Sequence, residues 1–280
     1  GSGKLSLNLT NLGFPDKKLQ TFRKWITQPY GMIIISGPTG SGKSTTLYAA
    51  LQEIHSEGIN ITTVEDPVEY QLAGINQVQM HDEIGLNFSA SLRSILRQDP
   101  DVLLIGEIRD EETANIAVKI SMTGHLVFST VHANDATSTI LRLLDLGIPP
   151  FLLGSSLNLV MAQRLVRTID KDSKEQYEPT QQELESIAFP SSKTKSTSFF
   201  RGVPNRSNHN TGYKGRTAIH EILEVDSSIK KLIFDGGDQN EIKEQAMKNG
   251  MTPLRDAGID KIISGSSSID EIRRATVEDI

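Results

Sequence analysis

Cysteine is absent from this 280-residue chain. Disulfide bonds and zinc sites built on cysteine thiolates are therefore excluded, which fits the reducing cytosol. Long apolar runs are missing too. No run approaches the roughly 20 residues that cross a bilayer, and no charged segment followed by an apolar one opens the chain like a signal peptide. We expect a cytoplasmic protein without a transmembrane segment, which reaches any membrane only through a partner.

An excess of basic residues is also lacking. The chain has 29 lysines and arginines against 35 aspartates and glutamates, a net charge of -6 and an isoelectric point near 5.6. Binding to nucleic-acid phosphates requires a concentrated basic surface, so we predict no direct nucleic-acid partner, although a local basic patch is compatible with these totals. The [NT]-K-x-D pattern with which GTPases recognise guanine is missing as well, and a GTPase switch is therefore disfavoured.

Apolar runs rich in β-branched residues have the length of strands that are buried on both faces. They cover 32–35, 61–64, 102–105 and 126–131, and helix-like stretches at 44–55, 88–97 and 111–122 lie between them. This alternation predicts an α/β fold with a mostly parallel sheet and helices on both faces. Further helical patterns cover 136–146 and 151–166.

The chain changes character near residue 168. Polar sequence without periodicity dominates up to residue 211, which is typical of surface loops around a small insert. A regular, strand-like pattern resumes at 217–223. Amphipathic helical patterns follow at 228–234, 239–249, 252–264 and 268–275. We predict three parts: a core (1–167), an insert (168–212) and a C-terminal strand with a helical subdomain (213–280).

A phosphate-binding loop, or P-loop, is predicted between the first strand and the first helix. The segment that matches G-x-x-x-x-G-K-[ST] consists of Gly37, Pro38, Thr39, Gly40, Ser41, Gly42, Lys43, Ser44 and Thr45. Its glycines let backbone N–H groups turn inward around phosphates, and the following helix adds its positive N-terminal end. We expect Lys43 to reach the β- and γ-phosphates of ATP and the Ser44 hydroxyl to ligate Mg²⁺.

Acidic residues follow two of the predicted strands. Glu65 and Asp66 end one strand and Glu107 ends another, which places them where parallel strands present nucleotide sites. We predict Glu107 as the catalytic carboxylate, with Glu65 and Asp66 supporting the metal or its waters. The alternative is that such acids cap the next helix, as we expect for Asp110.

Histidines and arginines supply further candidates. His132 follows the fourth strand and is placed to contact the γ-phosphate, whereas His125 lies at the other end of that strand and is expected to hydrogen-bond locally. Arg93 and Arg97 lie four residues apart on a helix and so share a face. That spacing suits two cations presented to a phosphate, and it equally suits a solvated face on which Arg97 pairs with a nearby aspartate.

In this order, these motifs resemble those of the secretion ATPase superfamily: type II secretion ATPases, type IV pilus assembly ATPases and their retraction relatives. In that family they form the Walker A loop (37–45), an Asp box (63–69), a Walker B strand ending in Gly-Glu (102–107) and a His box (123–132). The resemblance continues through 162–167 and 212–221. It implies a RecA-like P-loop NTPase core, a small insert, a C-terminal helical subdomain, and arginines at 93 and 97 that face a neighbouring active site.

Two features depart from the family. Assembly-type members carry a zinc module with two C-x-x-C pairs, and the matching places here hold Asp170, Ser173, Val203 and Arg206. No zinc is therefore predicted, and the insert must be held by packing or be mobile. Its presence still favours the assembly and secretion branch over the retraction ATPases, which lack it.

The second departure is length. Family members carry an N-terminal half that docks on the membrane platform and contributes arginines to the active site. Nothing before Leu5 corresponds to that domain. We expect a fragment with weakened hydrolysis and subunit assembly in isolation.

The resemblance implies a mechanism and a set of partners. MgATP binds at 37–45, Glu107 activates or positions water, and His132 and Asp66 sense the γ-phosphate. A homo-oligomeric ring, a hexamer by resemblance, would then drive pilus or pseudopilus growth with inner-membrane platform and cytoplasmic-ring proteins, at the periphery of the bacterial inner membrane. One rival is a nucleotide-gated scaffold that binds ATP with little hydrolysis. A small-molecule P-loop kinase fits the paired acidic strand ends and the distal histidine less well.

Overall fold

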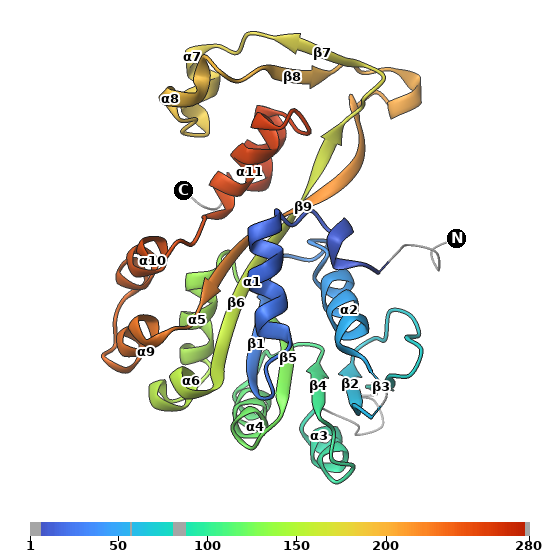
Figure 1. Ribbon diagram of the computed structural model, residues 1–280, viewed down its shortest axis with the longest axis vertical. Coiled ribbons are helices and arrows are strands. Elements are labelled where there is room, and N and C mark those ends of the chain that lie inside the picture. The colour runs from blue at the N-terminus through green and yellow to red at the C-terminus, as the bar shows by residue number, and fades with distance from the viewer. Residues whose placement is uncertain (1–6, 57, 81–87, 278–280) are drawn as a thin grey trace.

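The computed structural model describes residues 7–56, 58–80 and 88–277 (Figure 1). The strands are β1 (Gly31–Ser36), β2 (Ile61–Glu65), β3 (Asn76–Gln79), β4 (Val102–Ile105), β5 (Leu126–Val131), β6 (Leu157–Ile169), β7 (Lys174–Tyr177), β8 (Phe199–Gly202) and β9 (Tyr213–Glu224). The helices are α1 (Asp16–Ile26), α2 (Lys43–Ile54), α3 (Phe88–Leu96), α4 (Glu111–Met122), α5 (Ala136–Asp145), α6 (Pro150–Ser156), α7 (Gln181–Ser186), α8 (Ser191–Thr194), α9 (Ser227–Phe234), α10 (Gln239–Lys248), α11 (Leu254–Ile263) and α12 (Ile269–Ala275), with short 3₁₀ turns η2 (Leu9–Asn11) and η4 (Arg206–Asn208).

The main sheet has seven strands in the order β3-β2-β4-β5-β1-β6-β9. All neighbouring pairs are parallel except β6 and β9, which are antiparallel. Parallel neighbours require connections that carry the chain back to the same end of the strands, and helices form most of them, such as α2 between β1 and β2 and α4 between β4 and β5. The predicted α/β fold with a mostly parallel sheet is therefore confirmed.

Alternate side chains of the central strands point into separate apolar cores. Met32 and Ile34 of β1 belong to one core, which α3, α4, α5, α6, α9 and α10 cover. Ile33 and Ile35 belong to the other, which α1 and α2 cover. Because both faces are covered, these strands are mostly apolar and rich in β-branched residues, which made them recognisable in the sequence.

The predicted helix over 151–166 is wrong. The chain is helical only in α6 and then forms the long strand β6, which lies between β1 and β9. Nearly every side chain of β6 is buried or half-buried, so the alternation that marks a half-exposed strand is missing. Its Leu, Met, Ala, Gln and Arg residues also favour helix, and sheet packing overrides that preference. Helix α1 and the edge strand β3 were not predicted.

The insert is ordered. Strands β7 and β8 pair antiparallel beyond the end of the main sheet, and Figure 1 shows them with α7 and α8 at the far end of the long β6–β9 ribbon. Apolar side chains of the insert share a third core with α11 and α12; they are Leu184, Ile187, Phe189 and Phe199. The prediction of polar loops over 168–211 is therefore wrong in part. The insert was expected either to be held by packing or to be mobile, and the structure shows packing.

A buried asparagine, Asn208, lies inside the insert. The Asn208 amide nitrogen donates to Asp170 Oδ2 (2.9 Å), Ser173 Oγ (3.2 Å) and the Val203 carbonyl (3.0 Å). Asp170, Ser173 and Val203 are three of the four residues at which the sequence resemblance led us to expect the family's cysteines. The Asn208 side-chain oxygen accepts from the backbone N–H groups of Asn205 and Gly212. One amide thus ties both arms of the insert together by hydrogen bonds.

Replacing this amide should loosen the insert selectively. Asn208→Ala removes the side-chain hydrogen bonds to Asp170, Ser173, Val203, Asn205 and Gly212, and we expect a loss of about 1–3 kcal/mol in the free energy of unfolding. Hydrogen bonding by Asn208 holds the pKa of Asp170 below its ordinary value. That contribution is present above the unfolded-state pKa and is lost as the pH falls through the folded-state pKa, so the mutational effect should shrink in acid.

Urea unfolding at neutral and acidic pH measures both effects. Gln182→Ala, at an exposed position on α7, is the matched control. Equal stability of the Asn208→Ala and control variants at neutral pH would contradict the proposed role of the amide.

Within the described ranges, no helix has both the length and the apolar character needed to span a bilayer.

Candidate active site

The carboxyl ends of four parallel strands meet at one cleft. In the sheet, β1 leads into the P-loop, β5 ends before His132, β4 ends near Glu107, and β2 ends at Glu65. Their order β2-β4-β5-β1 brings these ends side by side at the crevice where such sheets bind ligands. The cleft has a volume of about 540 Å³. Its lining includes Thr39 to Thr45 of the P-loop together with Glu65, Asp66, Glu107 and His132.

The P-loop has a backbone that only glycine adopts readily. Gly37, Gly40 and Gly42 have φ angles of 155°, 83° and 88°, in the region that side chains disfavour. Helix α2 begins directly after Gly42, so its N-terminal N–H groups and positive dipole end face the loop. The buried Ser41 hydroxyl has no hydrogen-bond partner within the described part of the chain. The loop therefore offers the donors that a phosphate group requires.

Lys43 lies folded into this loop. Its Nζ donates to the Gly37 carbonyl at 2.5 Å. Burial lowers the pKa of Lys43, the nearby Glu107 carboxylate opposes that shift, and Arg164 adds to it. An incoming phosphate would compete with a neutral carbonyl for a cation that the protein has partly removed from water.

Glu107 contacts two basic side chains. Its Oε1 lies 3.2 Å from His132 Nε2, and its Oε2 lies 4.0 Å from Arg109 Nη1. The Ser129 and Thr130 hydroxyls donate to the carbonyls of Ile105 and Gly106, which fixes the end of β4 against β5. Glu107 and His132 were predicted separately, and the structure brings them together beside the P-loop.

Glu65 is held more tightly than the sequence suggested. It is buried, and its two oxygens accept hydrogen bonds from Tyr48 Oη (2.5 Å) and Thr63 Oγ1 (2.7 Å). Burial and this hydrogen bond raise the pKa of Tyr48. Asp66 follows and is exposed to the cleft.

The oxygen atoms of the cleft suit a magnesium ion. Ser44 lies in the first turn of α2, and Glu65 and Asp66 line the same cleft. Hydroxyl and carboxylate oxygens, completed by waters and substrate phosphates, are the ligands that Mg²⁺ takes in nucleotide sites. These residues therefore fit the predicted Mg²⁺.

The structure does not bring Arg93 and Arg97 into the cleft of their own chain. Arg93 is exposed and lies 3.5 Å from Glu112 on α4. Arg97 is exposed and makes no ion pair with the residues that the structure describes, so the pairing with a nearby aspartate, one of the two alternatives stated above, is not seen.

Two other residues serve locally, as expected. His125 precedes β5, at the end of the strand away from the cleft, and its Nδ1 lies 3.1 Å from the Ile120 carbonyl oxygen. Asp110 caps α4 by accepting from the Thr113 backbone N–H at 2.7 Å.

Sequence reasoning missed Gln163, which joins the P-loop to α2. This fully buried side chain of β6 donates to the Ser41 carbonyl (2.9 Å) and accepts from Thr46 Oγ1 (2.8 Å). A Cβ atom on Gly42 would lie 2.8 Å from its amide nitrogen, so this glycine is needed for the close approach. The one signal in the sequence was a glutamine and two arginines interrupting an apolar run.

Gln163→Leu should weaken nucleotide binding because it removes both hydrogen bonds at similar volume. We expect about a tenfold lower affinity for a non-hydrolysable ATP analogue and a loss of about 1–3 kcal/mol in stability. Fluorescent-nucleotide titration and urea unfolding measure these quantities, with the exposed Gln176→Leu as control. An analogue affinity equal to that of the control variant would show that Gln163 does not position the loop.

Known proteins share this fold and these motifs. The family model described as "Type II/IV secretion system protein" matches residues 2–274. The type IV pilus assembly ATPase PilB of Myxococcus xanthus is 48% identical over 276 residues, which are 98% of this chain and 49% of that protein. The type II secretion system ATPase E of Vibrio cholerae is 48% identical over 276 residues, covering 97% of this chain and 54% of that protein.

Solved structures agree on the fold. The pilus retraction motor PilT with bound ADP superposes with a TM-score of 0.70 at 26% identity, covering 95% of this chain and 65% of that one. The ATPase DotB of Legionella pneumophila gives a TM-score of 0.70 at 22% identity, covering 98% of this chain and 66% of that one. The chain spans about half the length of the curated relatives it matches. A family match over almost the entire sequence, together with this sheet order and cleft, shows that the chain belongs to the type II/IV secretion system protein family.

Proposed function

We propose that this chain binds MgATP in the cleft and hydrolyses it. The observation that supports this most is the convergence of the P-loop, the Glu107–His132 pair and the buried Glu65 on one cleft. A carboxylate beside a phosphate-binding loop is the arrangement that phosphoryl transfer to water requires. Relatives that are 48% identical are named as ATPases.

Each residue has a role in this proposal. The P-loop amides, the Ser41 hydroxyl and Lys43 hold the phosphate tail, and Glu107 orients or deprotonates the attacking water. His132, in contact with Glu107, senses the γ-phosphate together with Asp66. Ser44, Glu65 and Asp66 hold the metal and its waters. A bound Mg²⁺ would neutralise charge that develops on the phosphates.

At the level of the cell, we propose that hydrolysis powers assembly of a type II secretion pseudopilus or a type IV pilus. The named functions of PilB and of the secretion system ATPase E support this. The chain would work as a ring, a hexamer, at the cytoplasmic side of the inner membrane with platform and cytoplasmic-ring proteins. The core, insert and C-terminal part, as divided above, would form one subunit of that ring.

A steady-state phosphate-release assay tests hydrolysis against the rival scaffold function. It should use a protein of the relatives' full length, of which this chain spans about half. Sustained release that depends on Mg²⁺ and stops in Glu107→Gln supports the enzyme. Tight ATP binding without release would instead support a nucleotide-gated scaffold.

We also infer that Arg93 and Arg97 act on the cleft of a neighbouring subunit, because both are exposed and lie outside their own cleft. Mixed oligomers test this. Complete chains carrying Lys43→Ala, mixed with chains carrying Arg93→Ala and Arg97→Ala, should release phosphate faster than either variant alone. Co-assembled mixtures without any gain would contradict action between subunits.

A further inference from the structure

A buried carboxylate on the edge strand β9 joins the beginnings of two helices. Glu221 is only 2% exposed. Its Oε1 accepts from the backbone N–H of Ala136 at 2.8 Å, and its Oε2 accepts from the backbone N–H of Leu254 at 2.9 Å. Ala136 is the first residue of α5 and Leu254 is the first residue of α11. One side chain therefore fixes where both helices start.

Both N–H groups depend on a partner outside their own helix. The first N–H groups of an α-helix have no acceptor within the helix, and the positive end of the helix dipole favours a negative group there. Helix α11 follows Pro253 and has no side-chain cap of its own. Glu221 supplies the missing acceptor from the neighbouring strand.

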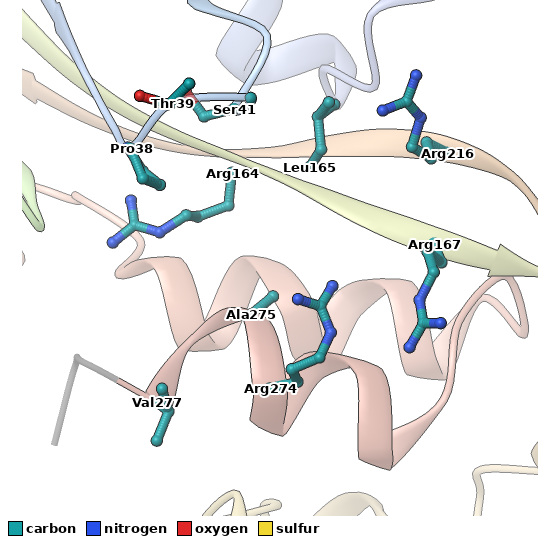
Figure 2. A pocket seen from close by; sticks show the side chains of 11 residues that line it. Pro38, Thr39, Ser41, Arg164, Leu165, Arg167, Arg216, Arg274, Ala275 and Val277 are labelled. Carbon is teal, nitrogen blue, oxygen red and sulfur yellow. The ribbon is translucent and has the colours of Figure 1, made fainter.

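The bond to Ala136 holds the loop that carries His132. This loop (132–135) runs from the end of β5 to the start of α5, so β5 fixes one end of it and Glu221 fixes the other. Arg164 of β6 holds the same loop by donating to the Asn134 carbonyl at 2.6 Å. Figure 2 shows the Arg164 side chain extending from β6 beside Pro38 of the P-loop.

The position of this loop determines the contact between His132 and Glu107. Their side chains lie 3.2 Å apart, from His132 Nε2 to Glu107 Oε1. Glu107 follows β4, whereas His132 belongs to the loop that Glu221 holds. A shift of the start of α5 would therefore move His132 relative to Glu107.

The bond to Leu254 ties the same carboxylate to the C-terminal helices. Helix α11 shares the third core with the β6–β9 ribbon and with the insert, through side chains such as Leu254, Ile219 and Phe199. Figure 1 shows α11 beside the part of the ribbon that is nearer the insert, and α5 beside the part that is nearer the central sheet. A displacement of α11 would thus act on the carboxylate that also holds α5.

We propose that Glu221 is a positioning residue for ATP hydrolysis: through Ala136 it places His132 against Glu107, and through Leu254 it links that placement to α11. The inference rests on the proposed function, because His132 and Glu107 act in it only if ATP is hydrolysed in the cleft. Glu221 acts through the loop and is assigned no contact with the nucleotide or the attacking water.

Steady-state phosphate release by a protein of the relatives' full length tests Glu221→Gln. Glutamine has a similar shape but only one acceptor oxygen for the two N–H groups. We expect kcat to fall at least about tenfold, since a small misplacement of a reacting group has effects of this size, while KM and analogue affinity stay within about threefold. Glu178→Gln, at an exposed position of the insert, makes the same charge change and should have no effect. An unchanged kcat in folded Glu221→Gln would overturn the proposal.

A double-mutant cycle with His132→Ala separates positioning from a general loss of structure. If Glu221 acts through His132, Glu221→Gln should lower kcat by less than about twofold in a protein that already lacks the imidazole. A loss of equal size in both backgrounds would show that Glu221 supports the fold as a whole, and it would overturn the positioning role.

Ala136→Pro is a second variant, which leaves the carboxylate in place and removes its N–H donor. Proline has no N–H and is favoured at the first position of a helix, so α5 should still form. We expect the same loss of kcat, again dependent on His132. A folded Ala136→Pro variant with wild-type kcat would contradict the proposal.

Amide hydrogen exchange tests the two bonds in the wild-type protein, whether or not the variants fold. The Ala136 and Leu254 amides should exchange at least about tenfold more slowly than that of Ser227, the exposed first residue of α9. Fast exchange of Ala136 would overturn the positioning role.

Exchange in α11 tests the link to the C-terminal helices. Magnesium and a non-hydrolysable ATP analogue should change the exchange rates of α11 amides at least about twofold in wild type but not in Glu221→Gln. No change in wild type that binds the analogue would overturn the link to α11. Wild-type protein that binds the analogue but releases no phosphate from ATP would count against the proposed function, and the exchange rates would still decide whether Glu221 links the two helices.

Discussion

Glu107→Gln is expected to lower ATP hydrolysis about 100- to 1,000-fold while analogue affinity stays within about threefold. Glutamine preserves the shape of the side chain and can still contact His132, but it cannot accept a proton from water. Glu107 Oε1 lies 3.2 Å from His132 Nε2, and Glu107 lines the same cleft as the P-loop. The substitution should therefore affect the activation of the attacking water and not the affinity for the nucleotide.

Phosphate release at saturating ATP and analogue titration separate these two effects. Glu178→Gln, an exposed residue of the insert, provides the control. If Glu107→Gln kept more than about half of the wild-type rate, the catalytic carboxylate would have to be another residue, and Glu65 would be the next candidate.

Lys43→Ala should abolish detectable binding at micromolar concentrations of nucleotide. A charge-assisted hydrogen bond contributes about 1.5–3 kcal/mol, and the lysine is expected to contact two phosphate groups, so the affinity should fall at least about 100-fold. The partial burial that lowers the pKa of Lys43 strengthens this expectation, since a cation partly removed from water gains more from an anionic ligand.

Lys119→Ala, an exposed lysine on α4, is the control for a simple change of net charge. Circular dichroism should show that both variants fold, because the main partner of Lys43 is a single loop carbonyl. Undiminished turnover in folded Lys43→Ala would refute the site.

The core of the fold could be predicted because its strands are buried on both faces and its helices alternate with them. The P-loop could be predicted because its glycines, lysine and serine serve a local geometry. Strand β6 could not, since complete burial removed its alternation and its residues favour helix. The order of the strands was not predicted either, and it is this order that brings Glu107 and His132 together.

Contacts between distant segments could not be predicted either, because they too depend on how the fold brings those segments together. Gln163 reaches Thr46 across 117 residues, and Tyr48 reaches Glu65 from the helix after the P-loop. Asn208 gathers Asp170, Ser173 and Val203 without any spacing pattern of its own. Such residues are defined by where the fold places their partners.

Isothermal titration calorimetry with magnesium and a non-hydrolysable ATP analogue tests the central claim most directly. The account predicts saturable heat corresponding to one nucleotide per chain, and its disappearance in Lys43→Ala. If well-folded wild-type protein gave no heat of association at millimolar nucleotide, the segment 37–45 would not be a nucleotide site, and both the motor and the scaffold would have to be abandoned.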